Sequence, residues 1–202
     1  LGPHVEWVPV CPEVEIGLGI PRPAIRLVRA GEVLALVDPK SGTDHTAAMA
    51  SWAKRRVHEL ERLELAGYVL KKDSPSCGMA RVRVWHAEPG RAPDRDGRGL
   101  FAGALLDALP LLPVEEEGRL HDPRLRENFV ERLFAYTRLR ALFAGRWSAG
   151  DLVAFHTAHK LTLLAHEPRA YAALGRLVAQ SGSLERAALR ARYEREFMTA
   201  LA

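Results

Sequence analysis

Hydrophobic and polar positions in the first part of the chain alternate between short apolar runs and a longer periodic stretch. Apolar runs at residues 5–10, 24–28 and 33–37 predict three strands, with a turn at Ala30-Gly31 between the second and the third. From about Thr46 to Leu65 apolar residues recur every three or four positions, which predicts an amphipathic helix that ends at Gly67. Residues 68–70 predict another strand. This order of strand, helix and strand is typical of a right-handed βαβ unit, so we expect a parallel sheet.

The pattern changes in the middle of the chain. Residues 88–99 are polar and rich in Gly and Pro, which predicts a loop leading into a helix over about residues 100–109. Residues 113–117 predict a last edge strand. The stretch from Gly118 to Pro123 then predicts a domain boundary, because no strand pattern follows it.

The rest of the chain predicts helices alone. Four are expected: one capped by Asp122 with Pro123 in its first turn, one from Ser148 or Asp151 to Leu164, one over residues 168–179, and one capped by Ser183. Short connections favour an antiparallel bundle. The expected fold is therefore an α/β domain with a Rossmann-like parallel sheet at residues 1–118, followed by an all-α domain at residues 119–202.

Composition places the chain among ordinary globular proteins. Hydrophobic residues make up 48% and charged residues 27%, which argues against disorder. No apolar run approaches the roughly 18 residues of a membrane helix, and the first residues do not resemble a signal peptide. We therefore expect a cytoplasmic protein. The chain begins with Leu1 rather than Met, which indicates a processed chain, a trimmed chain or a fragment.

Charge is spread unevenly along the chain. Residues 1–122 carry 16 Arg and Lys against 18 Asp and Glu, whereas residues 123–202 carry 13 against 7. The basic excess favours a polyanionic partner for the helical part. A solvated, Arg-rich helical surface would show the same pattern.

The two cysteines, Cys11 and Cys77, are the clearest candidates for chemistry. A disulfide is not expected in the cytoplasm, so core thiols, metal ligands and nucleophiles remain. Each cysteine follows a predicted strand and lies in a turn rich in Pro and Gly. Ligands in open α/β sheets bind beyond the carboxyl ends of the strands, so the placement favours one shared site.

Four segments in order carry a specific resemblance: Val8-Pro9-Val10-Cys11-Pro12-Glu13-Val14, Gly42-Thr43-Asp44-His45-Thr46, Ser74-Pro75-Ser76-Cys77-Gly78 and Gly97-Arg98-Gly99-Leu100-Phe101. They resemble the motifs of the iron–sulfur desulfidases that remove sulfur from thiolated uracils. Residues 122–129, 150–153 and 155–160 are similar to the YbgA-type helical domain of unknown function that is fused to some members.

The resemblance implies a [4Fe–4S] cluster held by three cysteines, with Cys11 and Cys77 as two of the ligands. The iron without a protein ligand would bind the thiocarbonyl sulfur and polarise the C=S bond for attack by water. A carboxylate would move the protons, with Glu13 as first choice and Asp44 as second. Four side chains are candidates to hold the substrate or the cluster: Ser74, Ser76, Lys72 and Thr46. In the plainer alternative, Glu13 caps a helix near Val14 and the serines only shape a turn.

One departure from the family pattern concerns the first cluster cysteine. Family members carry it a few tens of residues before the Cys-Pro-Glu motif, and this chain has no third Cys. Either the protein begins upstream or the cluster is lost, and the intact pattern after Leu1 favours a trimmed chain. We therefore predict the family's function for the complete protein and an empty or damaged cluster site in these residues.

His156 and His159 form a second candidate group, since a spacing of three places both on one helical face. With Asp151 they could hold a metal, but polar residues at a helix–helix contact are the commoner case. Four arginines nearby in sequence favour an RNA or nucleotide phosphate instead: Arg124, Arg126, Arg138 and Arg140.

Three functions remain after these observations. The favoured one is iron–sulfur-dependent conversion of a thiolated uracil or uridine, as a nucleotide or in tRNA, to the oxo form with release of sulfide. The alternative is a non-catalytic nucleic-acid-binding or interaction protein that uses the basic helical domain. Thiol-based hydrolase or redox chemistry comes last, because the sequence has no CxxC and no His flanks either Cys.

Overall fold

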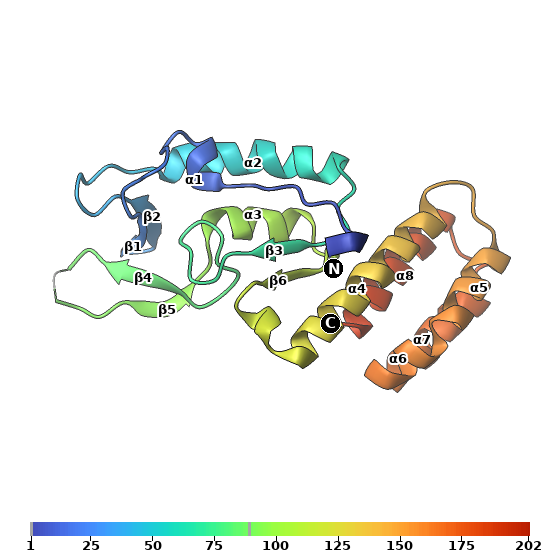
Figure 1. The fold of residues 1–202 in the computed structure, drawn as a ribbon. Coiled ribbons are helices and arrows are strands. Elements are labelled where there is room, and N and C mark those ends of the chain that lie inside the picture. Colours follow the sequence, from blue (N-terminus) through green and yellow to red (C-terminus); the bar gives the residue numbers. More distant parts are fainter. Residues whose placement is uncertain (1, 89) are drawn as a thin grey trace. The chain divides into compact units, whose positions relative to one another are not determined.

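The computed structural model describes residues 2–88 and 90–202, and the chain divides into two compact units. The first takes in most of the residues up to Gly118. The second contains Arg119–Ala202 with two short stretches, Ala66–Tyr68 and Leu111–Glu115. Figure 1 shows strands and helices together in the first unit and helices in the second.

The main sheet of the first unit has four strands in the order β2-β1-β4-β5. These strands are β1 (Arg26–Ala30), β2 (Val33–Val37), β4 (Val82–His86) and β5 (Asp94–Gly97). β1 pairs with β2 in an antiparallel hairpin and with β4 in parallel, while β4 and β5 are antiparallel. The hairpin turns at Gly31, whose φ of +63° few other residues tolerate. The sheet is therefore mixed.

Two helices of the first unit supply a large part of its core. α2 (Thr46–Arg62) buries Met49, Trp52, Ala53, Val57 and Leu60, the face that its apolar periodicity predicts. α3 (Leu100–Ala108) packs on α2 through the rings of Trp52 and Phe101, whose centroids are 5.2 Å apart. α1 (Pro12–Glu15) is a single turn, and η1 (Gly2–His4) is a short 3-10 turn.

The fold class is confirmed, and three details of the prediction are wrong. Residues 5–10 form no strand, because they are largely exposed and pair with no neighbour among the described residues. β2 and β3 (Tyr68–Leu70) lie in different sheets, so strand, helix and strand do not make a βαβ unit; β3 pairs instead with β6 (Val114–Glu116). β4 and β5 were not predicted, and the Asp-Arg-Asp-Gly sequence of β5 is polar enough to resemble a loop.

The second unit contains five helices after the short 3-10 turn η2 (Arg119–His121): α4 (Pro123–Phe143), α5 (Ala149–Ala158), α6 (Lys160–His166), α7 (Pro168–Ala179) and α8 (Arg186–Ala200). The predicted helix from 148 to 164 is interrupted at His159, whose ψ of 12° ends α5 and starts α6. Fully buried side chains that include Leu152, Tyr193 and Phe197 form the core. No helix in the described parts of the chain is both long and apolar enough to cross a membrane.

Side chains cap these helices at their first turns. Asp122 accepts hydrogen bonds from the backbone N–H groups of Arg124 and Leu125, as predicted. Ser148 and Asp151 form a capping box at the start of α5. The cap of α8 is Glu185 rather than the predicted Ser183.

His156 and His159 belong to the core of the helical unit. The Nδ1 atom of His156 lies 3.1 Å from the Tyr193 hydroxyl, and its ring stacks on that of Tyr171. The Nδ1 atom of His159 lies 2.9 Å from the Phe155 carbonyl. Burial lowers the pKa of both histidines from the usual 6.5, and the neighbouring His159 lowers that of His156 further. The carboxylate of Asp151 is engaged in its capping box, so it does not join the pair as a metal ligand.

Acidification should destabilise the helical unit through these two histidines. Because folding lowers the pKa of both, the unfolded chain takes up more protons than the folded chain once the pH falls below about 6.5. The stabilisation is therefore complete above that pH and is lost as the pH falls towards the lowered values. The free energy of unfolding in urea should decrease from pH 7.5 to pH 5.5.

The double variant His156→Gln, His159→Gln should show a smaller decrease over this range. His121→Gln, at an exposed position, should follow the wild type. The same pH slope in the wild type and the double variant would contradict the prediction.

Candidate active site

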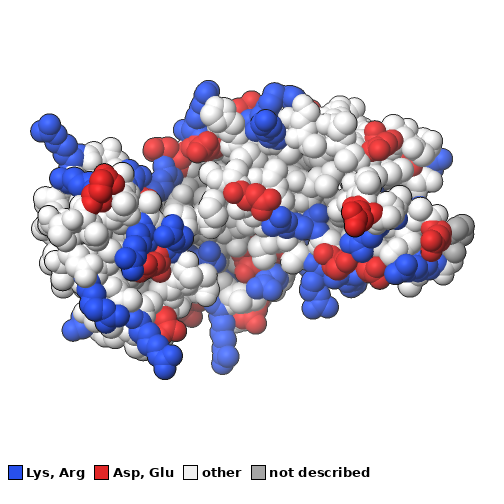
Figure 2. Space-filling model, turned by 180° about the vertical axis from the view of Figure 1, so that it is seen from behind, with Lys and Arg blue, Asp and Glu red and all other residues white. Residues whose placement is uncertain are grey.

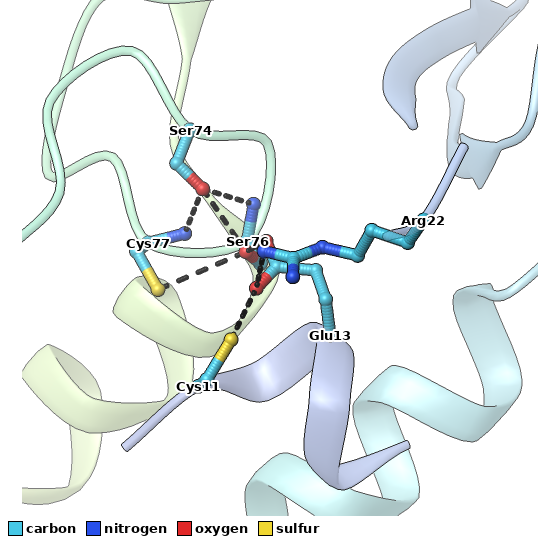
Figure 3. Close-up of polar contacts among 6 residues, drawn as sticks. All are labelled: Cys11, Glu13, Arg22, Ser74, Ser76 and Cys77. Carbon is cyan, nitrogen blue, oxygen red and sulfur yellow. Dashed lines mark hydrogen bonds and ion pairs between the residues drawn. The ribbon is translucent and has the colours of Figure 1, made fainter. Parts of the chain in front are cut away.

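The two cysteines lie on separate segments whose side chains point toward one another (Figure 3). Cys11 precedes the first residue of α1, where Pro12 starts the helix. Cys77 lies in the loop between β3 and β4 and is only 8% exposed. Neither forms a disulfide. Together with Glu13, Ser74 and Ser76 they form the candidate site.

The carboxylate of Glu13 lies at the centre of the site and is only 7% exposed. It accepts a hydrogen bond from the Ser76 hydroxyl. It also accepts a weak one from the thiol of Cys11, whose Sγ atom lies 3.5 Å from Oε2. Arg22 completes the surroundings, with a guanidinium nitrogen 3.5 Å from the same oxygen. Glu13 therefore joins α1 to the loop that carries Cys77.

The serine hydroxyls shape that loop and link it to the carboxylate. Ser74 Oγ accepts hydrogen bonds from the backbone N–H groups of Ser76, at 3.3 Å, and Cys77, at 3.1 Å. The two hydroxyl oxygens are 3.0 Å apart. Because the Ser76 hydroxyl donates its only proton to Glu13, Ser74 is the donor in this pair. The chain of donors thus runs from Ser74 through Ser76 to Glu13.

The first turn of α3 is hydrogen-bonded to the loop that carries Cys77. The backbone N–H groups of Leu100 and Ala102 donate to the carbonyls of Pro75, at 3.2 Å, and Ser76, at 3.0 Å. A Cβ atom on Gly99 would lie 2.4 Å from the carbonyl carbon and oxygen of Ser76. Only glycine allows α3 to approach so closely, which explains the glycine before this helix.

The environment of Cys77 disfavours a free thiolate. Burial is the main effect that raises its pKa to about 12, and the nearby Glu13 and Cys11 add to it. The Ser76 and Ser74 hydroxyls beside the thiol oppose the rise only in part. A nucleophilic cysteine needs the opposite environment, so this finding weighs against the thiol-based hydrolase hypothesis.

The remaining predicted site residues contact their own neighbours. The Asp44 carboxylate accepts hydrogen bonds from the backbone N–H and hydroxyl of Thr46, which lowers its pKa. Thr46 Oγ1 in turn accepts from the backbone of Leu36, so this pair fixes the start of α2. Lys72 is exposed, and its backbone N–H donates to Glu117. Within the described residues, no hydrogen bond or ion pair joins Asp44, Thr46 or Lys72 to the two cysteines.

The plainer alternative for Glu13 is wrong, because α1 begins at Pro12 and Glu13 lies inside its first turn. The alternative in which the serines only shape the turn agrees with the contacts of Ser74. Ser76 differs, because its hydroxyl also contacts Glu13. Sequence reasoning assigned no role to Arg22. Its place in the Pro21-Arg22 pair, nine residues after Glu13, was the available signal.

Comparison with known proteins agrees with the two cysteine segments. The sequence model of the family "2-thiouracil desulfurase" matches residues 1–117. The chain belongs to the 2-thiouracil desulfurase family. A second family model, of proteins of unknown function (DUF1722), matches residues 160–202. Both parts of the resemblance inferred from the sequence are thereby confirmed.

One solved relative was found for this desulfurase-family chain. It is the [4Fe-4S]-dependent thiouracil desulfidase TudS, at 32% sequence identity. The match covers 57% of this chain and 69% of that one, with a TM-score of 0.42. The curated proteins gave no match.

The donor set of this chain does not fit a complete [4Fe–4S] cluster. Cys11 and Cys77 are the two cysteines of the sequence, and two thiolates are a poor holder for a cubane. Within residues 2–88 and 90–202 no group of three or more His, Cys, Asp or Glu side chains could hold a metal ion. A third thiolate would have to come from outside these 202 residues.

The contact between Gly99 and Ser76 predicts a specific sensitivity to substitution. Gly99→Ala should lower the free energy of unfolding by about 1–3 kcal/mol, because the new methyl group would force the backbone of the Cys77 loop to shift. Gly103→Ala, on the same helix, is the matched control. Its methyl group would meet only the Arg98 side chain, at 3.4 Å, so this variant should be neutral or stabilised by up to about 1 kcal/mol.

Urea unfolding of both variants checks this prediction. Equal stability of the Gly99 and Gly103 variants would show that α3 does not hold the loop as described.

Proposed function

We propose that this chain provides the reaction centre of a desulfidase that converts a thiolated uracil to its oxo form. The substrate is the free base, the nucleoside, the nucleotide or the base within tRNA. Water supplies the oxygen and the sulfur leaves as sulfide, so the C=S bond is replaced by C=O without any change in oxidation state. Support comes from membership of the 2-thiouracil desulfurase family and from the buried carboxylate between two cysteine segments.

Glu13 is proposed as the proton carrier. It lies within hydrogen-bond reach of the Ser76 hydroxyl and the Cys11 thiol, so it can take a proton from the attacking water and return it to the departing sulfide. Arg22 forms an ion pair with the same carboxylate. Ser76 and Ser74 are proposed to orient the substrate, because their hydroxyls form one continuous chain with Glu13. Asp44, Thr46 and Lys72 are weaker choices, since their contacts lie elsewhere.

Cys11 and Cys77 are proposed as two of the thiolate ligands of an iron–sulfur cluster. The relative TudS is described as [4Fe-4S]-dependent, and thiolates are the usual ligands of such clusters. In this proposal Glu13 transfers the proton, Ser74 and Ser76 orient the substrate, and the two thiols only bind metal. A test of the isolated chain therefore includes a small thiol in solution, offered in place of the missing ligand.

The test is anaerobic incubation of the chain with ferrous iron, sulfide and dithiothreitol, followed by removal of unbound metal. The wild type should retain iron and release sulfide from 2-thiouracil, measured together with the loss of thiocarbonyl absorbance. Cys11→Ala and Cys77→Ala should retain less iron. Glu13→Gln should retain iron but release sulfide roughly 10²–10⁴ times more slowly, because it cannot carry a proton.

Glu59→Gln, an exposed carboxylate on α2, is the matched control and should behave like the wild type. Full activity of Glu13→Gln would remove Glu13 from the mechanism. Iron retention and sulfide release that are unchanged in Cys11→Ala and Cys77→Ala would contradict the proposed function itself.

A further inference from the structure

A pocket in the helical unit lies apart from every residue assigned above. Gly145, Arg146, Trp147 and Arg186 line it, from the segment between α4 and α5 and from the first residue of α8. Its volume of about 540 Å³ falls within the roughly 300–1,000 Å³ of small-molecule sites. We call it the Trp147 pocket.

The Trp147 pocket carries positive charge that no carboxylate neutralises. Within the described residues, neither Arg146 nor Arg186 forms an ion pair. The acidic residues nearest in sequence are engaged as helix caps: Asp151 binds Ser148, and Glu185 accepts from the backbone of α8. Arginines further along α8 do have partners, as Arg190 pairs with Glu194 and Arg192 with Glu196. The charge of the pocket is thus a local feature.

Arg186 sits at the start of a helix. It is the first residue of α8, where the partial positive charge of the helix attracts anions and repels cations. Arg146 lies in the segment between α4 and α5. A cation at a helix start without a carboxylate partner breaks a local rule, and broken local rules of this kind concentrate at functional sites.

An aromatic ring completes the Trp147 pocket. The guanidinium of Arg186 lies 4.4 Å from the centre of the half-buried Trp147 ring. The ring meets Phe143 edge-on, with centroids 5.0 Å apart. These contacts fix the ring in one orientation at the pocket wall. Arg186 thus covers one face of the ring. A fixed ring beside guanidinium groups that lack a carboxylate partner is an arrangement that nucleic-acid-binding proteins use to stack a base and bind its phosphate.

The surface charge elsewhere does not explain the pocket. On the face in Figure 2, acidic side chains are interspersed with the basic ones, so this face presents no continuous basic surface. On this face the basic excess of residues 123–202 therefore does not gather into one basic surface.

We propose that the Trp147 pocket binds a phosphorylated nucleoside of single-stranded nucleic acid, with Arg146 and Arg186 on the phosphate and Trp147 stacked on the base. This goes beyond the desulfidase reaction, because it assigns a ligand site to the helical unit. A free nucleotide offers the same chemistry as a strand, and the experiment below separates the two.

The experiment is fluorescence anisotropy of a labelled ten-residue oligouridine with the full chain at several salt concentrations. Arg146→Ala and Arg186→Ala should each weaken binding about tenfold or more, since hydrogen bonds to charged groups contribute about 1.5–3 kcal/mol. Each should also make the logarithmic salt dependence shallower by about 0.7. Arg169→Ala removes the same charge from an exposed position on α7 and should change neither the affinity nor the folding.

Stacking on the indole has its own readout. Oligouridine should quench tryptophan fluorescence of the wild type, and Trp147→Phe, which keeps a ring in the core, should lose that part of the quenching. Uridine monophosphate that displaces the oligomer at a similar concentration would identify the free nucleotide as the ligand, and failure to do so would identify the strand. Equal weakening by Arg169→Ala, or binding without quenching that inorganic polyphosphate fully displaces, would overturn the proposal.

Discussion

The hydrogen bond from Ser76 to the buried carboxylate of Glu13 is the interaction on which the candidate site depends. The two residues are 63 positions apart in the sequence. Glu13 lies two residues after Cys11, and Ser76 directly precedes Cys77. A buried carboxylate is costly unless its oxygens are hydrogen-bonded, so the segment after Cys11 and the loop with Cys77 stabilise each other only when they meet. The approach of the two thiols is a consequence of that contact.

The rest of the first unit keeps the two segments in place. Glu15, at the end of α1, accepts a hydrogen bond from the Trp52 ring at 3.2 Å and pairs with Arg56 at 3.3 Å, which ties α1 to α2. The first turn of α3 donates to the carbonyls of the Cys77 loop, and α3 packs on α2 through the same Trp52. Both cysteine segments thus rest on one pair of helices. A site meant to hold a metal group needs this kind of support, since ligands on unsupported loops lose their geometry.

The prediction that the two cysteines lie near each other rested partly on a wrong reason. It placed both cysteines at strand ends, yet Cys11 follows an extended segment without strand pairing, and the carboxylate of Glu13 brings it to Cys77. Apolar periodicity predicted the helices well, because burial of one face determines them. It could not predict β5, whose side chains are polar and whose stability comes from pairing with β4. The break at His159 and the cap at Glu185 depend on contacts with other helices and with local backbone, which the periodicity does not contain.

In the helical unit too, the sequence shows the arginines and the tryptophan of the Trp147 pocket, but it does not show that they lie together in one pocket. For the chain as a whole, the central claim is that Glu13 and Ser76 hold the two cysteine segments together. A double-mutant cycle with Glu13→Ala, Ser76→Ala and the double variant, measured by urea unfolding, tests it most directly. The account predicts a coupling free energy of about 1–3 kcal/mol, as for hydrogen bonds to charged groups. Additive effects, with a coupling within error of zero, would contradict it.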